Sequence, residues 1–339
     1  MLYFSEINHR GNHAGTKARN DVETILRQCG AKPLNSQRLE LQAENGVIRS
    51  NIANRLGFLR YYLDILRIRK ETIIIQYPML AFDVQFDYVQ RLAMRNRVIF
   101  LVHDIQSLRR DGNAGLDREI EMLNLASGLI VHNRFMEQKL RELGIRVEKV
   151  YLLNCFDYLY EGDTTADSTI EGVAFAGNLE KSEFLPAMCT KNPHLDFHFY
   201  GNGWSENISH GIYHGSFPPD DIPGRMCGKY GLIWDGRTTI GCTGSVGEYM
   251  RINNPHKLSL YIAAGLPVVT WSGAAIAEFI AQHNLGITVE QLDDLQQTLS
   301  NIDDSQYENM KNNVLRIRED LIKGAFLRTA LSAVEEDAR

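Results

Sequence analysis

The segment from Gly244 to Trp271 holds the residues best suited to bind an anion. A glycine-rich loop leads to two asparagines and Pro255, and an apolar run then continues to Gly265. Asn is a favoured N-cap, Pro a favoured first helical residue and Gly a favoured residue past a helix end, so a helix is expected to start at Pro255 and to precede a buried strand. Its first turn offers free N–H groups and a positive dipole end, to which Lys257 adds a full charge. The segment therefore predicts a diphosphate site.

A second feature is the pair His103-Asp104, which follows the apolar run 97–102. In an open parallel sheet, ligands bind beyond the carboxyl ends of the strands, so catalytic groups are expected at this position. A carboxylate there could take a proton from an attacking hydroxyl, which makes Asp104 a candidate general base. Asp104 could equally cap the next turn, and His103 could be a hydrogen-bonded core residue. Tyr77, at the end of the preceding apolar run, is expected to line the same cleft.

Residues 8–19 form a glycine-containing turn between a strand-like run and a helix-like one. Gly15 would let the backbone approach a ligand, and Thr16, Lys17 and Arg19 follow it. The turn lacks the GxGxxG dinucleotide fingerprint and a later acidic residue to complete it. An ordinary strand-to-helix turn remains an alternative, but the polar and basic cluster favours contact with a donor or an acceptor.

The second half of the chain has a similar turn at Gly177 and Asn178, with Lys181 placed to meet a phosphate. Turn chemistry alone would also explain the Gly-Asn pair. Asp235 follows another strand-like run and could bind a sugar hydroxyl. Two acids one residue apart, the pattern of metal-dependent sugar transfer, are absent there. We therefore predict no essential metal and no cofactor.

Composition and charge narrow the classes of function. The chain has 339 residues, 44% of them hydrophobic and 23% charged, which is typical of a soluble globular protein long enough for two domains. Residues 1–150 carry a net charge of +6 and the remainder −12, so the first half is expected to face an anionic membrane surface or a phosphorylated acceptor. Nucleic acid is not predicted as a partner, because no basic tract is interleaved with exposed aromatics.

The location of the protein is predicted from features that the sequence lacks. The five cysteines form no CxxC pair and are expected to be reduced thiols. No signal-peptide pattern and no apolar run of about 18–20 residues is found, so a cytoplasmic protein is predicted. Residues 55–70 carry five basic residues on a helical pattern. They are read as a helix with a core face, or alternatively as an interfacial helix that grips anionic lipid.

Short apolar strands alternate with helical segments along the whole chain, which indicates two doubly wound parallel sheets with helices on both faces. We predict an α/β fold of the GT-B type, in which two Rossmann-like domains face each other across a cleft. The predicted domains are residues 1–155, with a C-terminal helix at about 322–339 packing back on them, and residues 156–321. The polar stretch 160–169 is the expected linker. The predicted strands are 2–7, 72–77, 97–103, 128–132, 147–153, 173–176, 196–200, 230–234, 267–271 and 286–289.

The motifs together resemble a known family. The run GLIWDG…CTGSVGEYMRINNPHKLSLYIAAGLPV, with AGTKAR, LVHDI and FAGNL before it, resembles bacterial β-1,6-galactofuranosyltransferases of O-antigen synthesis over essentially the whole chain. A fainter resemblance extends to the streptococcal glucosyltransferases that extend N-acetylglucosamine on serine-rich adhesins. Both imply a GT-B fold and a UDP-sugar donor.

The resemblance also implies roles for individual residues. Lys257 and the surrounding helix turn would hold the diphosphate, Lys181 stands where the glucosyltransferases carry an Arg, and Phe217 would lie near the uracil. Lys17, Arg19 and Tyr77 would face the acceptor. The implied donor contacts are Gly15, Thr16, Gly177, Asn178, Lys181, Phe217, Asp235, Asn254, His256, Lys257, Leu258 and Ser259.

The resulting expectation is a cytoplasmic, inverting hexosyltransferase. Only Glu248 is present where retaining GT-B enzymes often carry two glutamates eight positions apart, which favours inversion with Asp104 as the base and His103 beside it. The expected donor is UDP-galactofuranose, and the acceptor an oligosaccharide in surface polysaccharide synthesis on a lipid-diphosphate carrier, with peripheral membrane contact and a homo-oligomer possible. The alternatives are a UDP-glucose or UDP-galactose transferase acting on a glycoprotein glycan, and a non-catalytic nucleotide-sugar-binding partner of another transferase.

Overall fold

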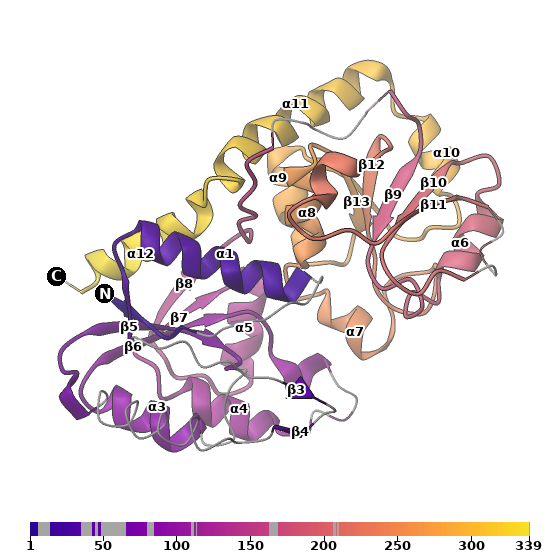
Figure 1. Ribbon diagram of the computed structural model, residues 1–339. Coiled ribbons are helices and arrows are strands. Elements are labelled where there is room, and N and C mark those ends of the chain that lie inside the picture. Colours follow the sequence, from indigo (N-terminus) through magenta and orange to yellow (C-terminus); the bar gives the residue numbers. More distant parts are fainter. Residues whose placement is uncertain are drawn as a thin grey trace.

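The computed structural model consists of two parallel β-sheets with flanking helices, joined side by side (Figure 1). It describes residues 1–5, 14–34, 43–44, 47–48, 66–79, 85–109, 112, 114–162, 169–205, 208 and 210–338. The start of the predicted turn 8–19, the helix predicted at 55–70 up to residue 65, and most of the linker predicted at 160–169 lie outside these ranges.

The first sheet has the order β2-β1-β5-β6-β7-β8 and is parallel throughout. The strand predicted at 2–7 is assigned only over Leu2–Tyr3. The strands are β1 (Leu2–Tyr3), β2 (Lys32–Pro33), β5 (Thr72–Tyr77), β6 (Arg97–Val102), β7 (Gly128–Val131) and β8 (Lys149–Leu152). The pair β3 (Ala43–Glu44) and β4 (Val47–Ile48) forms a separate antiparallel ribbon.

The continuous apolar runs of the central strands are explained by cores on both faces of this sheet. Ile73 and Ile75 belong to one core, whereas Ile74 between them belongs to the other, as the period of two in a strand requires. The first core is shared with α3 (Gln85–Ala93), α4 (Leu116–Leu123) and α5 (Arg134–Glu142), and the second with α1 (Ala14–Gln28) and α12 (Ala325–Glu336).

The second sheet has the order β11-β10-β9-β12-β13-β14 and is also parallel. The edge strand β11 was not predicted, because its residues are exposed or half-exposed and lack an apolar run. The strands are β9 (Val173–Ala176), β10 (Phe197–Tyr200), β11 (Ile212–Gly215), β12 (Tyr230–Ile233), β13 (Val268–Trp271) and β14 (Gly286–Val289). The helices are α6 (Leu185–Lys191), α7 (Gly244–Tyr249), α8 (His256–Ala263), α9 (Ile276–His283), α10 (Leu295–Ser300) and α11 (Asp304–Leu321), with short 3-10 turns η1 (Gln106–Arg109) and η3 (Ile222–Arg225).

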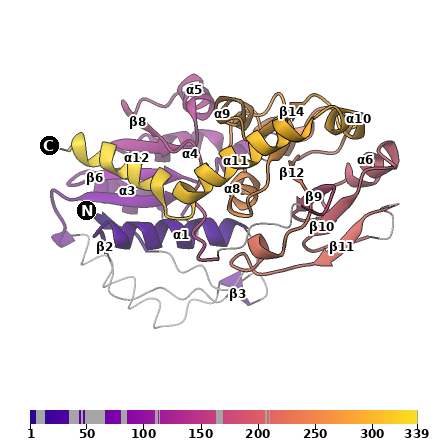
Figure 2. The same ribbon diagram turned by 90° about the horizontal axis from the view of Figure 1, so that it is seen from above.

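The C-terminal helices connect the two halves. After α11 the chain turns at Gly324, which has a left-handed φ of 82°, and α12 lies alongside α1 on the first sheet (Figure 2). The Asp157 carboxylate accepts the backbone N–H groups of Phe326 (3.1 Å) and Leu327 (2.7 Å) at the start of α12. These bonds attach α12 to the chain that connects the two sheets.

A second joint is formed around Asn254, a predicted donor contact. Its side-chain amide donates to the carbonyls of His132 (3.0 Å) and Asn154 (2.7 Å), and its Oδ1 accepts from Asn133 (2.6 Å). The side chain is buried and its amide and carbonyl groups are used between the two halves, and a contact of Asn254 with the donor stays a prediction. Because these groups are used there, Asn254 does not cap α8, which begins at His256 with Pro255 as N-cap, one residue later than predicted.

Candidate active site

A cavity of about 400 Å³ lies at the carboxyl ends of β9, β10 and β11, where a parallel sheet is expected to bind ligands. Its volume is in the range of roughly 300–1,000 Å³ that is usual for ligand pockets. The first half of the chain contributes Gly15, at the start of α1. The lining residues are Gly15, Tyr158, Ala176, Gly177, Asn178, Tyr200, Gly201, Asn202, Ser216, Phe217, Pro219, Ile222, His256, Lys257 and Leu260.

One part of the cavity is aromatic and apolar. The rings of Tyr200 and Phe217 have their centroids 6.4 Å apart, and the Arg225 guanidinium lies 5.1 Å from the Phe217 ring centroid. Tyr158 and Ile222 complete this part of the lining. Flat, apolar walls with nearby backbone polar groups suit a planar heterocyclic base.

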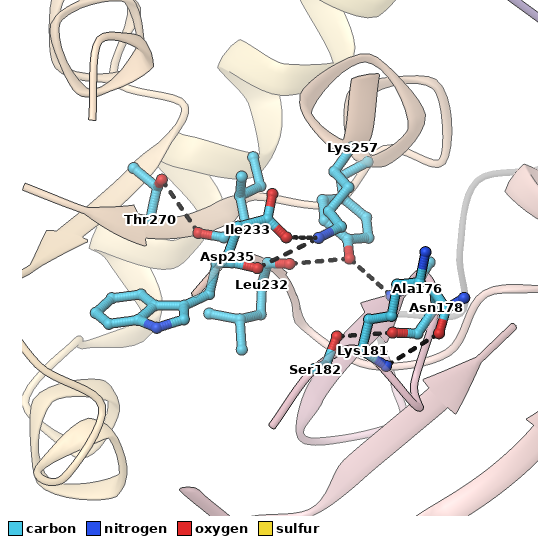
Figure 3. Close-up of polar contacts among 11 residues, drawn as sticks. Ala176, Asn178, Lys181, Ser182, Leu232, Ile233, Asp235, Lys257 and Thr270 are labelled. Atoms are coloured by element: carbon cyan, nitrogen blue, oxygen red, sulfur yellow. Dashed lines mark hydrogen bonds and ion pairs between the residues drawn. The ribbon is translucent and has the colours of Figure 1, made fainter. Parts of the chain in front are cut away.

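The other part is the N-terminus of α8, where Lys257 supplies positive charge. The Lys257 ammonium contacts the Asp235 carboxylate at 3.0 Å, as Figure 3 shows, and it also donates to the Trp234 carbonyl at 3.3 Å. A Cβ on Gly177 would lie 3.3 Å from Lys257 Cε, so only glycine leaves this approach uncrowded. Asp235 is therefore the ion-pair partner of Lys257 in this structure. A dianion at the helix end would compete with that carboxylate for the ammonium.

The strand ends and α8 are held in register by Tyr261. Its buried hydroxyl accepts the Ala176 N–H at 2.9 Å and donates to the Leu232 carbonyl at 3.0 Å (Figure 3). A Cβ on Gly231 would collide with the Tyr261 ring at 2.3 Å, which explains the glycine in the middle of β12. These contacts place Lys257 opposite the turn at Gly177.

His256, the first residue of α8, presents an unused imidazole at the cavity. Both ring nitrogens are buried without a hydrogen-bond partner among the described residues, and the ring lies between Phe156 (5.6 Å) and Tyr158 (5.7 Å). Burial, with a smaller contribution from Lys17, lowers the pKa of His256 to about 3. The ring is therefore neutral, and its one N–H and one lone pair can serve a ligand.

Three further predicted donor residues lie elsewhere. Leu258 is a core residue, and the Ser259 hydroxyl donates to the Phe156 carbonyl at 2.7 Å, so both side chains are engaged inside the protein; a donor contact of this helix turn stays a prediction. Lys181 is exposed on the turn after β9, where its backbone N–H donates to Asn178 Oδ1 (3.0 Å), and it does not line the cavity.

The candidate base lies at the end of β6, in the first half of the chain. Asp104 Oδ2 is 2.7 Å from Arg109 Nη1. Burial raises the pKa of Asp104, against the opposing effect of Arg109 and of the Tyr249 hydroxyl. Tyr249 comes from α7 and packs in the core of the first sheet, with its hydroxyl accepting the Ile105 N–H at 2.8 Å. No local pattern could place this tyrosine beside Asp104, because the two residues are 145 positions apart in the chain.

His103 connects the strand end with the cavity. Its Nε2 is 2.7 Å from Gln76 Oε1, and its ring stacks on Phe156 at 5.4 Å, which in turn contacts His256. Burial lowers the pKa of His103 well below its usual value. His103, of the predicted catalytic pair, and His256, at the predicted donor site, thus both contact the Phe156 ring.

The predicted acceptor residues are largely engaged inside the protein. Tyr77 is buried in the first core, and its hydroxyl donates to Glu119 at 2.9 Å, while an acceptor contact stays a prediction. Arg19 is buried and donates to the Pro78 carbonyl at 2.5 Å. Lys17 is buried with three oxygen partners, and Thr16 beside it is also buried.

Within the described residues, no three His, Cys, Asp or Glu side chains are grouped as metal ligands, and independence of metal stays a prediction. No helix in the same ranges is both long and apolar enough to cross a bilayer.

Two parallel-sheet domains, with a cavity between the strand ends of the second sheet and the start of α1, are the architecture of the GT-B class of glycosyltransferases. Sucrose-phosphate synthase from Thermosynechococcus elongatus has the same fold, with a TM-score of 0.63 at 12% identity over 99% of this chain and 98% of that one.

The sequence patterns of the N-terminal and C-terminal domains of the glucosyltransferase 3-like family match residues 1–155 and 173–334, and the chain belongs to this family of glycosyltransferases. β-1,6-galactofuranosyltransferase WbbI of Escherichia coli K12 is 28% identical over 100% of this chain and 99% of its own length. Glucosyltransferase 3 of Streptococcus gordonii is 24% identical over 95% and 94%.

Proposed function

We propose that this glycosyltransferase transfers galactofuranose from UDP-galactofuranose to a sugar acceptor with inversion. The observation that carries the donor class is the cavity, with its aromatic part and its charged helix N-terminus. Full-length similarity to a β-1,6-galactofuranosyltransferase supports the choice of sugar. An aromatic site joined to a helix N-terminus suits a nucleoside diphosphate, because stacking takes the base and N–H groups with Lys257 take the phosphates.

In this proposal the uracil lies against Phe217 and Tyr200, and the diphosphate lies between Gly177 and the first turn of α8. The sugar then extends toward Phe156 and His103. Neutral His256 would hydrogen-bond to the donor without adding charge. Lys257 would stabilise the negative charge that develops on the departing UDP, which is where electrostatic stabilisation contributes most.

Asp104 is the proposed general base. It would accept the proton of an acceptor hydroxyl while that oxygen forms the new bond to the anomeric carbon and the bond from this carbon to the β-phosphate oxygen breaks. Burial raises the pKa of Asp104 and so makes the carboxylate a stronger base. Arg109 holds one carboxylate oxygen, and the Tyr249 hydroxyl also hydrogen-bonds to the carboxylate, so both orient Asp104 toward its role. The lone Glu248, exposed and paired with Arg251 at 2.6 Å, supports inversion rather than retention.

The proposed acceptor is an oligosaccharide of surface polysaccharide synthesis, carried on a lipid diphosphate. The net charge of +6 on residues 1–150 suits an anionic carrier and peripheral contact with a membrane. We further propose that the enzyme acts in the cytoplasm without metal and could assemble as a homo-oligomer.

The test compares UDP-galactofuranose, UDP-galactopyranose and UDP-glucose side by side, with simple glycosides as acceptors and EDTA present. Transfer confined to the furanose donor, with a β-linked product, is the expected result. A preference for UDP-glucose would favour the activity named for the streptococcal relatives. UDP binding without transfer or hydrolysis would instead favour a nucleotide-sugar-binding partner of another transferase. Activity that is lost in EDTA and restored by Mn²⁺ would contradict the metal-independent reaction.

A further inference from the structure

A salt bridge between the two domains contacts a segment that forms one wall of the cavity. Lys17, on α1 of the first domain, contacts Asp220 Oδ1 at 2.7 Å. Asp220 belongs to the wall segment, residues 216–221, which runs from β11 to η3 and contributes Ser216, Phe217 and Pro219 to the cavity lining. The contact therefore connects the acceptor-side domain to the part of the donor domain that faces the nucleotide.

The Lys17 end of this bridge is rigid. Its ammonium also contacts Asp21 at 2.9 Å and donates to the Leu159 carbonyl at 2.7 Å, and the Lys17 side chain is only 7% exposed. The Lys17 ammonium also lies 5.0 Å from the centroid of the Tyr158 ring. These contacts fix the charge at the junction between α1 and the interdomain connection, so it cannot follow Asp220 if the wall moves away.

The Asp220 end is different, because the Asp220 side chain is 77% exposed and has little packing to hold it. A second contact to the wall comes from the interdomain connection, where the Tyr158 hydroxyl donates to the Pro219 carbonyl at 2.5 Å. The wall is thus held at two adjacent residues, Asp220 by α1 of the first domain and Pro219 by the chain that connects the two sheets.

We propose that Lys17 and Asp220 form an interdomain latch that positions the wall segment against the donor nucleotide. The first domain then contributes to donor affinity without touching the donor, and opening of the domains releases the wall together with the nucleotide. This inference rests on the proposed nucleotide-sugar donor, and Lys17 and Asp220 are positioning residues.

The test uses Asp220→Asn, with Asp221→Asn as the matched control. Asp221 is the exposed neighbour, and it makes no ion pair with any residue that the structure describes. Both variants remove one negative charge from the same segment, so general electrostatic effects on UDP binding cancel in the comparison. Lys17 is left unchanged, because its removal would leave the buried Asp21 carboxylate without its partner.

UDP affinity and dissociation rate are measured by calorimetry and stopped flow, and amide hydrogen exchange is followed across residues 212–222. Asp220→Asn is expected to weaken UDP binding about three- to five-fold, mainly through faster dissociation, as suits one partly exposed ion pair. The rate of amide hydrogen exchange in the wall segment should also rise in Asp220→Asn. Asp221→Asn should change neither quantity, and Asp220→Glu should restore most of the affinity.

The outcomes distinguish failure of the latch proposal from failure of the proposed nucleotide donor. Wild-type protein that fails to bind UDP would contradict the nucleotide donor and, with it, the effect of the latch on donor affinity. UDP binding that is normal in wild type and equal in the two Asn variants would overturn the latch alone. Equal weakening in both variants would show a general charge effect and would also reject it.

Discussion

Replacing Lys257 with Met is the most direct test of the diphosphate site. The Lys257 side chain is 16% exposed and that of Asp235 is 32% exposed, so their ion pair contributes at most about 1 kcal/mol to folding stability. Lys257→Met should therefore fold normally. A charged hydrogen bond to a phosphate contributes about 1.5–3 kcal/mol, equivalent to about 10- to 150-fold in affinity. The donor must displace or share Asp235, so a loss near the lower end, about 10- to 30-fold in UDP affinity, is expected.

The structure adds a second expectation for the same site. In Lys257→Met the Asp235 carboxylate loses its counter-ion and repels the diphosphate. The double variant Lys257→Met/Asp235→Asn should therefore bind UDP about three-fold more tightly than the single variant. Lys181→Met is the control, because Lys181 is exposed and does not line the cavity. Calorimetry at about 0.1 M salt measures all four proteins. UDP affinity within about three-fold of wild type in Lys257→Met would refute the placement of the diphosphate.

Three further predictions test the general base, the contact between the two halves at Asn254, and the predicted acceptor residue Tyr77. Asp104→Asn should keep UDP affinity and lose at least about 100-fold in kcat; retained turnover would assign the proton transfer to another group. The His132 ring accepts the Asn254 N–H at 2.9 Å, and burial lowers the pKa of His132 to about 4. Because the unfolded chain binds a proton at this residue below about pH 6.5 and the folded protein does not, the contribution of His132 to the free energy of unfolding falls as the pH drops toward 4. Between pH 7 and 5 it accounts for about 2 kcal/mol, and urea unfolding of His132→Asn should show a pH dependence smaller by that amount; an unchanged slope would contradict a neutral buried ring. Tyr77→Phe should lower the free energy of unfolding by about 1 kcal/mol and leave the KM for acceptor unchanged, whereas a large rise in KM would support the acceptor role.

The sequence predicted the architecture well because the relevant signals are local. Continuous apolar runs such as 97–102 indicate strands covered on both faces, and the alternation of Ile73, Ile74 and Ile75 between two cores confirms that reading. Strand β11 was missed because an edge strand on the surface needs no apolar run. The cavity residues that were predicted, including Gly177 and Lys257, lie next to strand or helix ends, whose position is readable from the chain.

What only the tertiary structure decided is which polar side chains face the cavity and which hold the domains together. Asn254 and His132 are 122 positions apart, and Lys17 and Asp220 are 203 apart, so no local pattern could pair them. A buried polar group must find a hydrogen-bond partner, and whether that partner is a ligand or another part of the chain depends on packing between distant segments. The sequence by itself determined that two parallel sheets carry glycine turns and a charged helix start at their edges. Packing between the domains determined that Lys257 and His256 line the cavity while the side chains of Asn254, Ser259 and Lys17 bind other parts of the chain.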